Sequence, residues 1–341
     1  MPQPVNVAVV GFGFAGRTFH APLIAAEPGL VLHTVVSSRP DEVRAAHPGA
    51  RVVSDYGAVL TDPAVDLVVL ATPDPLHAQQ AEAALRAGKA VVVDKPFVLT
   101  LADARRVVDL AKARGLLLSV FQNRRWDADF LSLRAEIASG RLGRVVTFES
   151  RFDRYRPVVR DRWREAEGAG VWFDLGPHLV DQALVLFGRP LGVTLDLAIQ
   201  RDGGLSPDWA HAVLRYEAPR VVLNAAMMIA APDVRFAVHG TRASLLSSGL
   251  DPQEDQLKAG LPVGGPGWGV DPSPMIRVEG DSGHRVPVEG PAGDYPAYYS
   301  GIAAALRGEG DNPVPPDQAL AVMEVIEAGV ESARLHREVA L

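Results

Sequence analysis

The chain of 341 residues contains no cysteine. Disulfide bonds, thiolate zinc sites and cysteine nucleophiles are therefore excluded. A clustered basic stripe is also missing, and acidic residues outnumber basic ones, which gives a formal net charge of −7. This balance argues against a nucleic-acid partner.

Long apolar runs are missing as well. No uninterrupted apolar segment approaches the roughly 20 residues that are needed to span a bilayer. The first apolar strand begins at Val5, which leaves no room for a signal peptide. We therefore expect no membrane partner and a cytoplasmic location.

The sequence is organised around its first supersecondary unit, which runs from Val5 to Arg39. A short charge-free run, Val5 to Val10, leads into a glycine-rich turn and an apolar stretch, and Val31 to Val36 is a second β-branched run. This order of strand, turn, helix and strand is typical of a dinucleotide-binding βαβ unit. The predicted turn comprises Gly11, Phe12, Gly13, Phe14, Ala15 and Gly16.

Each glycine of this turn has its own expected role. Gly11 allows the tight turn, Gly13 lets a pyrophosphate approach the backbone, and Gly16 lets the helix pack against the strand. The phosphates would lie at the helix N-terminus, where unpaired N–H groups favour negative charge. The alternative is a purely structural turn.

The end of the second strand indicates which dinucleotide binds. An NAD site usually has an acidic residue here, but this chain has Ser37, Ser38 and Arg39. A guanidinium and two hydroxyls suit a ribose 2′-phosphate, so NADP is favoured and NAD remains possible. Asp41 is a counter-signal, and a simple polar turn is the alternative interpretation.

Up to about residue 126, short apolar strands alternate with helices, which is typical of a doubly wound parallel sheet. The polar segments follow the strands, at the edge where such sheets bind ligands. The predicted strands are 51–54, 66–71, 90–93 and 116–121, and the predicted helices are 41–46, 77–87 and 100–114.

The pattern changes after Trp126. Residues 145–152 alternate between apolar and polar side chains, which predicts a half-buried antiparallel strand. The fold class is thus α/β plus α+β: an N-terminal Rossmann domain over 1–125, and a domain over 126–341 built on an open, mostly antiparallel sheet. Its further predicted strands are 193–201, 210–216, 220–228 and 234–239, with shorter ones near 276 and 284. Its predicted helices are 129–139, 176–187 and 318–337. The last of these helices is expected to pack back toward the first domain. Residues 249–296 are expected to form long loops around short strands.

Two clusters could carry chemistry. Lys95 follows a buried strand within Asp94-Lys95-Pro96, where an ammonium can polarise a carbonyl or hydroxyl; the alternative is a lysine that covers a strand end. Asp174 and His178 are four residues apart and share a face of a helix. A carboxylate beside an imidazole suits proton abstraction from an alcohol, whereas a capping Asp with a buried His is the structural alternative. No third ligand lies at suitable spacing, so we expect no metal.

These motifs resemble the glucose–fructose oxidoreductase/inositol dehydrogenase (Gfo/Idh/MocA) family over essentially the full chain. The resemblance rests on the glycine turn, on Asp94-Lys95-Pro96, where Asp replaces the more usual Glu, and on Asp174 with His178. Residues 19–23, 119–127 and 148–154 are similar to the NADP-dependent scyllo-inositol dehydrogenase branch.

The resemblance implies that Lys95, Asp174 and His178 line the place where nicotinamide and a sugar meet. It implies a cofactor path along Ala71, Thr72, Pro73, His77, Asp94 and Pro96, and contacts of Asn123 and Arg124 with the nicotinamide ribose and substrate. A segment that reaches over the cofactor would contain Arg162 and Trp163, unless residues 151–164 form only a solvated loop. His20 is expected to be structural.

The expected activity is therefore hydride transfer between NADP and a cyclic polyol or sugar. The alternatives are a non-catalytic NADP-binding sensor on the same fold, and a reductase of another carbonyl or imine substrate. The run from Val221 to Ile229 is apolar almost without a break, which predicts an apolar uncovered sheet face and a homodimer or homotetramer formed through it.

Overall fold

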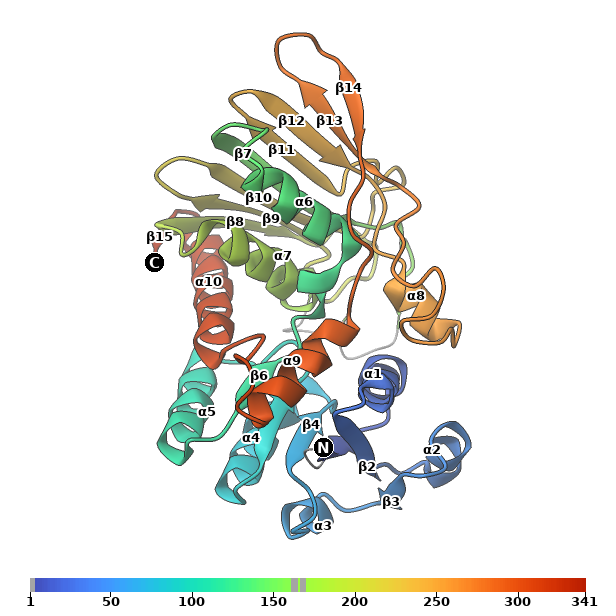
Figure 1. Ribbon diagram of the computed structural model, residues 1–341. Helices are drawn as coiled ribbons and strands as arrows, with labels where there is room; N and C mark the ends of the chain where they lie inside the picture. The colour runs from blue at the N-terminus through green and yellow to red at the C-terminus, as the bar shows by residue number, and fades with distance from the viewer. Residues whose placement is uncertain (1–3, 161–164, 166–169) are drawn as a thin grey trace. The chain divides into compact units, whose positions relative to one another are not determined.

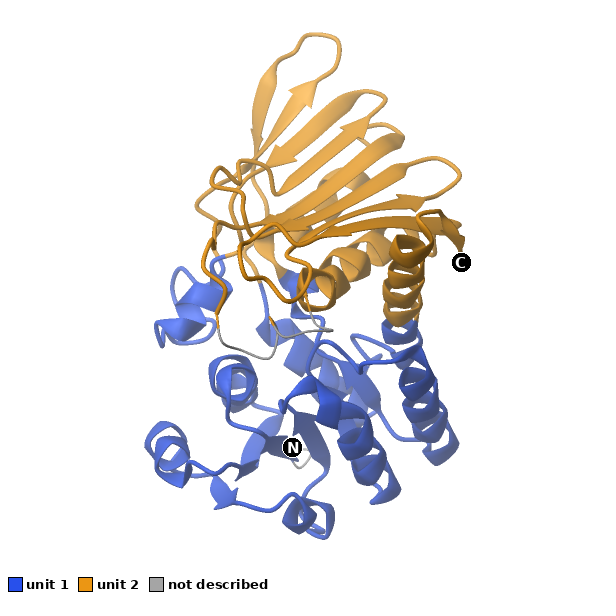
Figure 2. Ribbon diagram, turned by 180° about the vertical axis from the view of Figure 1, so that it is seen from behind, with its two compact units in different colours: residues 1–126, 252–269, 294–320 blue, residues 127–251, 270–293, 321–341 orange. Residues whose placement is uncertain are grey.

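The computed structural model describes residues 4–160, 165 and 170–341, and the chain divides into two compact units. Unit 1 comprises residues up to 126 with 252–269 and 294–320, and unit 2 comprises 127–251, 270–293 and 321–341 (Figure 2). The first crossing between them lies beside the expected boundary at 125/126. Two segments that the sequence assigned to the second domain, 252–269 and 294–320, instead belong to unit 1.

Unit 1 contains a six-stranded sheet in the order β3-β2-β1-β4-β5-β6, with all neighbours parallel. The strands are β1 (Val5–Val10), β2 (Leu30–Val36), β3 (Arg51–Val53), β4 (Leu67–Leu70), β5 (Ala90–Val93) and β6 (Leu118–Val120). Every residue of β4 and β5 is buried, as expected for parallel strands covered on both faces. The strand order reverses between β1 and β4, which is where this fold binds its ligand. The predicted Rossmann sheet is confirmed.

The helices of unit 1 begin and end close to the predicted residues. α5 (Leu101–Arg114) begins after Thr100, whose hydroxyl accepts from the Asp103 N–H, and ends at Gly115 in the left-handed conformation. The other predicted helices are a π-helical turn η1 (Gly16–His20) leading into α1 (Ala21–Ala26), then α2 (Pro40–Ala46) and α4 (His77–Arg86). The sequence did not predict α3 (Gly57–Leu60), α8 (Gln253–Lys258) or α9 (Pro296–Leu306), and the short 3-10 turns η2 (Asp74–Leu76) and η3 (Asn123–Trp126) complete the unit.

Unit 2 is built on a nine-stranded sheet in the order β14-β13-β12-β11-β7-β10-β9-β8-β15 (Figure 1). All its pairs are antiparallel except β7 with β10, so the predicted mostly antiparallel sheet is confirmed. The strand β7, predicted to be antiparallel, is so to β11 and is parallel to β10. The alternation of apolar and polar side chains along β7 indicates which face of the strand is buried. It does not indicate whether a neighbouring strand runs parallel or antiparallel to it. The strands are β7 (Val145–Asp153), β8 (Gly192–Ala198), β9 (Trp209–Arg215), β10 (Arg220–Ala226), β11 (Phe236–Gly240), β12 (Ala243–Ser247), β13 (Met275–Glu279), β14 (Arg285–Val288) and β15 (Val339–Ala340).

One face of this sheet is covered by α6 (Ala128–Ala138), α7 (Val171–Phe187) and the C-terminal part of α10 (Pro316–Leu335), as Figure 1 shows. α7 begins five residues before the predicted start at Gly176, and Pro177 lies inside the helix. A Cβ on Gly176 would lie 2.9 Å from the Trp172 ring and 3.0 Å from Ile326 Cδ1. Gly176 therefore serves close packing between α7 and α10.

The opposite face differs from the predicted apolar patch. No helix of unit 2 lies over it in the part of the chain that the structure describes (Figure 2). Leu223 and Met227 face the helices and belong to the buried core, whereas Val222 pairs with Glu149 and Val213, and Asn224 pairs with Arg151 and His211. The uncovered face is thus mixed, since the long apolar run of β10 supplies both faces.

Among the described residues, none of the helices combines the length and the apolar character that crossing a membrane requires.

Candidate functional site

The glycine turn after β1 has the geometry that a dinucleotide needs. Gly11 has a φ of +97°, and a Cβ there would lie 2.7 Å from the Ala71 carbonyl oxygen. A Cβ on Gly16 would lie only 2.0 Å from the Gly11 carbonyl oxygen, so this glycine is required by the turn itself as much as by helix packing. By contrast, a Cβ on Gly13 would have no atom within 4 Å. The open space therefore lies where a pyrophosphate would approach the backbone.

A cavity of about 380 Å³ lies at this turn, within unit 1. Its volume is in the range of ligand pockets, which begin at about 300 Å³. It is bordered by the ends of β1, β2, β3 and β4, the carboxyl edge of the sheet at the β1–β4 reversal. The lining residues are Val10, Gly11, Phe12, Gly13, Val36, Ser37, Ser38, Arg39, Ser54, Tyr56, Thr72 and Gln80. These residues fit the adenosine side of a dinucleotide.

The end of β2 brings Ser37, Ser38 and Arg39 to the cavity as predicted. The Ser37 hydroxyl accepts from the Arg39 backbone N–H at 3.0 Å, and the Arg39 guanidinium donates to the Phe12 carbonyl oxygen. The counter-signal Asp41 does not line the cavity; its side chain is 96% exposed and pairs with Arg44 at 3.0 Å. Among the described residues, the side-chain polar groups at the cavity are therefore hydroxyls, the Gln80 amide and the Arg39 guanidinium, with no carboxylate among them.

Ser54, Tyr56 and Gln80 were missed by the sequence analysis. Tyr56 Oη donates to the Gln80 carbonyl oxygen at 2.7 Å, and burial raises the pKa of the Tyr56 hydroxyl. Thr72 Oγ1 donates to Gln80 Oε1 at 2.6 Å. The signal that could have found Ser54 and Tyr56 is the end of the minor strand β3, which shares the carboxyl edge with β1 and β2.

Asp94 and Lys95 follow β5, Asp94 buried and Lys95 partly exposed. Burial would raise the pKa of Asp94, but a hydrogen bond from His20 and the charges of His20, Lys95 and His77 outweigh it and hold this pKa below its usual value. His20 is fully buried, with Nδ1 2.6 Å from Tyr299 Oη and Nε2 3.5 Å from Asp94 Oδ1. His20 therefore supports the loop that carries Lys95, as its predicted structural role requires.

His77 joins two of the loops at this edge. Its side chain is fully buried, with Nε2 2.9 Å from the Thr72 carbonyl oxygen and Nδ1 2.9 Å from that of Pro96. The peptide bond between Lys95 and Pro96 is cis. The ring nitrogens of His77 thus hold the loops after β4 and β5 together, and a direct contact with the cofactor stays a prediction.

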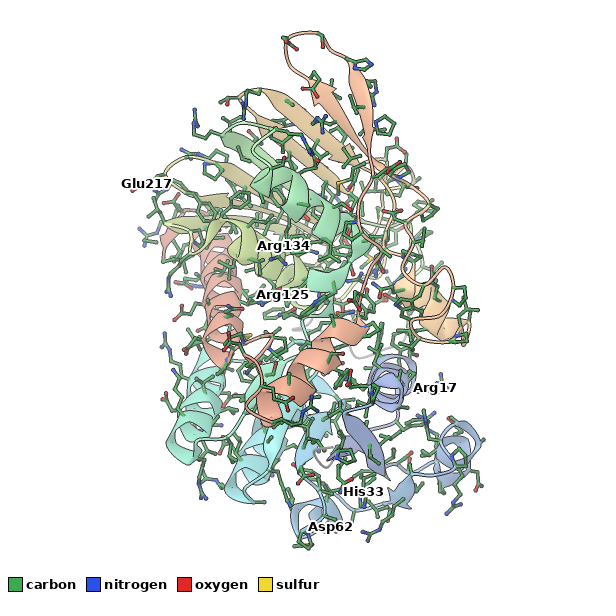
Figure 3. All side chains as sticks on the ribbon, in the orientation of Figure 1. Arg17, His33, Asp62, Arg125, Arg134 and Glu217 are labelled. Carbon is green, nitrogen blue, oxygen red and sulfur yellow. The ribbon has the colours of Figure 1, made fainter. Side chains whose placement is uncertain are left out.

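The segment after β6 carries Asn123 and Arg124, both buried in the turn η3. Arg124 Nη2 lies 3.0 Å from Glu254 Oε2 on α8, and α8 packs beside η1. The next residue, Arg125, labelled in Figure 3, donates to Gln318 Oε1 at 2.6 Å. These bonds hold the turn in place within unit 1, while its predicted contact with substrate stays a prediction.

In unit 2, Asp174 and His178 lie one turn apart on α7, as their spacing predicted. His178 is 4% exposed, and its ring centroid lies 6.3 Å from that of Phe152 on β7. One turn further, Gln182 accepts from Arg235, whose guanidinium lies between the rings of Phe152 and Phe236. This buried network fixes the α7 face that carries the histidine.

Two predicted cofactor residues, Arg162 and Trp163, lie outside the described residues. Within the described residues, no group of three His, Asp or Glu side chains is arranged to hold a metal ion.

The comparisons with known proteins agree with this geometry. A family model described as "Oxidoreductase family, NAD-binding Rossmann fold" matches residues 5–122, and one described as "Oxidoreductase family, C-terminal alpha/beta domain" matches residues 134–341.

Among the curated relatives that match over nearly the whole chain are two bacterial oxidoreductases. The oxidoreductase YdgJ of Escherichia coli (strain K12) is 50% identical, covering 99% of this chain and 98% of its own. The scyllo-inositol 2-dehydrogenase (NADP(+)) IolW of Bacillus subtilis (strain 168) is 34% identical, covering 99% and 96%. Among solved structures, YPO2259 of Yersinia pestis has a TM-score of 0.96 at 48% identity and covers 100% of this chain and 98% of its own.

Proposed function

Because this chain belongs to the Gfo/Idh/MocA family of oxidoreductases, we propose that it is an NADP-dependent dehydrogenase of a cyclic polyol or sugar. The reaction would transfer a hydride between nicotinamide and a CH–OH group of an inositol- or inosose-like compound. The observation that carries the proposal is the cavity bordered by Gly13, Ser38 and Arg39, with its hydroxyl and guanidinium groups. The activity of IolW, a scyllo-inositol 2-dehydrogenase (NADP(+)) that is similar to this chain over nearly its full length, supports the substrate class.

The cofactor preference rests on the end of β2. A 2′-phosphate would take charge-assisted hydrogen bonds from Arg39 and hydroxyl donors from Ser38. The adenosine of NAD, which lacks that phosphate, would bind in the same cavity without these contacts, so we propose NAD as a weaker second cofactor.

Three residues of the chain would carry the chemistry. His178 would take the proton from the substrate hydroxyl as general base, and Asp174, one turn before it on α7, would position the imidazole or a neighbouring hydroxyl. The ammonium of Lys95 would stabilise the developing alkoxide. Nicotinamide, when bound, supplies the hydride chemistry itself.

The open sheet face of unit 2 supports a proposal on assembly. Val222 and Val213 are neighbours on that face. Their row continues through Glu149 on β7 to Ala237, Leu246 and Ile276 on β11, β12 and β13, so it is apolar except for Glu149. We propose that a second copy of the chain covers this row, giving a homodimer and, by pairing of dimers, a homotetramer.

The experiment that tests the function is a panel of inositols, inososes and aldoses with NADP and NAD, followed at the nicotinamide absorbance. We expect turnover of at least one cyclic polyol or its ketone, with NADP preferred. Binding of NADP without turnover of any compound would favour a sensor instead, and turnover limited to imines or unrelated carbonyls would change the substrate class.

A further inference from the structure

Three charged side chains meet beside the glycine turn of unit 1. Glu42, in the first turn of α2, lies with Oε2 3.1 Å from Arg39 Nη1 and 3.7 Å from Arg17 Nη1. Its second oxygen lies 3.4 Å from the same Arg39 nitrogen. Figure 3 shows Arg17 pointing away from the helical ribbon that follows the turn, on the side where α2 lies. One carboxylate is therefore placed between two guanidiniums.

The position of Arg39 ties this cluster to the cavity. One of its terminal nitrogens binds Glu42 and the other donates to the carbonyl oxygen of Phe12, which lines the cavity. The hydroxyl of Ser37 also holds the Arg39 backbone N–H. The guanidinium is thus fixed at the cavity with part of its donor set already used by an acidic side chain.

Two acidic residues follow β2, and only one of them faces this cluster. Asp41 is almost fully exposed and pairs with Arg44, whereas Glu42 pairs with both Arg39 and Arg17. The two residues are adjacent and carry the same charge, so they form a matched pair for experiment.

We propose that Glu42 is a further specificity-determining residue of the nucleotide site, and that its carboxylate competes with a ribose 2′-phosphate for Arg39. The inference rests on the proposed NADP site. A 2′-phosphate needs the N–H groups that Glu42 occupies and is repelled by its charge. An unphosphorylated ribose needs no phosphate-binding N–H group of Arg39 and carries no charge that Glu42 would repel. Glu42 therefore narrows the preference for NADP over NAD.

The expected effect of Glu42 on 2′-phosphate binding is modest, because its ion pair with Arg39 is partly exposed to solvent. The Arg39 and Glu42 side chains are 44% and 45% exposed, so their ion pair is screened and is readily displaced. Removing the carboxylate charge should therefore tighten binding of a 2′-phosphate by about three- to tenfold.

The test uses the full chain and two nucleotide fragments, adenosine 2′,5′-bisphosphate and adenosine 5′-monophosphate, with dissociation constants from calorimetry at constant ionic strength. Glu42→Gln should tighten the bisphosphate about three- to tenfold and leave the monophosphate equal or weaker. The control Asp41→Asn should change neither constant by more than about twofold.

The inference is overturned if Glu42→Gln leaves the ratio of the two constants unchanged, or if Asp41→Asn changes it equally. The parent protein tests the proposed cofactor preference separately. If it binds both fragments with equal affinity, the proposal that NADP is preferred is wrong. A Glu42→Gln variant that then acquires a preference for the bisphosphate would still uphold the role of Glu42.

Discussion

Arg39 is the residue on which the cofactor proposal depends most. Its guanidinium lies at the cavity, held by Phe12 and Glu42. Arg39→Ala should raise the KM for NADP about ten- to a hundredfold, since a charge-assisted bond to phosphate contributes roughly 1.5–3 kcal/mol. The KM for NAD should change little. Ser38→Asp should act in the same direction, and a parent enzyme that already prefers NAD would contradict the prediction.

The pKa values of Asp94 and Asp153 are displaced in opposite directions, and each shift predicts how the stability of the fold changes with pH. The pKa of Asp94 is lowered despite its burial, because His20 and neighbouring charges outweigh desolvation. Its ionised form therefore stabilises the fold above the unfolded-state pKa of about 3.9, and this contribution is lost as the pH falls through the lower folded-state value. Asp94→Asn should lower Tm at pH 7, with a smaller difference in acid.

The pKa of Asp153 is shifted in the opposite direction to that of Asp94. Burial raises its pKa, although Asn224 and Arg151 act against it. The ionised form is disfavoured by folding, so its cost appears as the pH rises from about 3.9 through the folded-state pKa. Asp153→Asn, which keeps an oxygen for the Asn224 amide, should raise Tm at pH 7 and leave it unchanged in strong acid. A lower Tm at pH 7 would contradict the sign.

At the scale of elements, substitutions at two glycines of the turn after β1 should affect folding and nucleotide binding separately. Gly16→Ala should destabilise unit 1, because its Cβ would lie 2.0 Å from the Gly11 carbonyl oxygen. Gly13→Ala meets no atom within 4 Å, so it should keep the Tm of the parent and lose nucleotide affinity. Thermal unfolding and calorimetric titration of NADP measure the two effects. Equal losses of stability in both variants would show that Gly13 is a structural glycine only.

The elements that the sequence predicted are those with a strong local signal. Thr100 and Gly115 mark both ends of α5 through a side-chain cap and a left-handed glycine, and the predicted helix 100–114 agrees with the observed bounds. α7 was predicted too short: the helix begins at Val171 and continues through Gly176 and Pro177, two residues of low helix propensity. β12 and α8 were missed, since each is short and lies among turn-forming residues.

The candidate site was predictable to a similar degree. The motif residues Gly11, Gly13, Ser37 and Arg39 lie at one cavity because parallel strands end at one edge. Gln80 carries no motif, and its place depends on how α4 packs. The sequence analysis likewise did not select Glu42, because its proposed role depends on its ion pairs with Arg39 and Arg17, which only the structure shows.

At the scale of the whole molecule, the assembly proposal gives a test on the open sheet face. Val222→Arg places a long cationic side chain beside Val213 in the largely apolar row of that face and should convert the oligomer to monomers with little change in Tm. Leu223→Arg would instead disrupt the core, because Leu223 is fully buried on the helix side. Light scattering at low concentration measures the mass, with Glu217→Arg in an exposed turn as the control. A parent protein that is monomeric would contradict the proposal.

The central claim, a dehydrogenase that uses Lys95 and His178, is tested most directly by turnover of two variants with retained cofactor binding. Lys95→Met and His178→Asn keep side chains of similar size while removing the ammonium and the base. On the best polyol of the parent, each should lower kcat about a hundredfold or more, since a general base contributes on the order of 10² to 10⁴ in rate. NADP affinity of His178→Asn should stay within about threefold of the parent. Turnover equal to that of the parent in both variants would contradict the account.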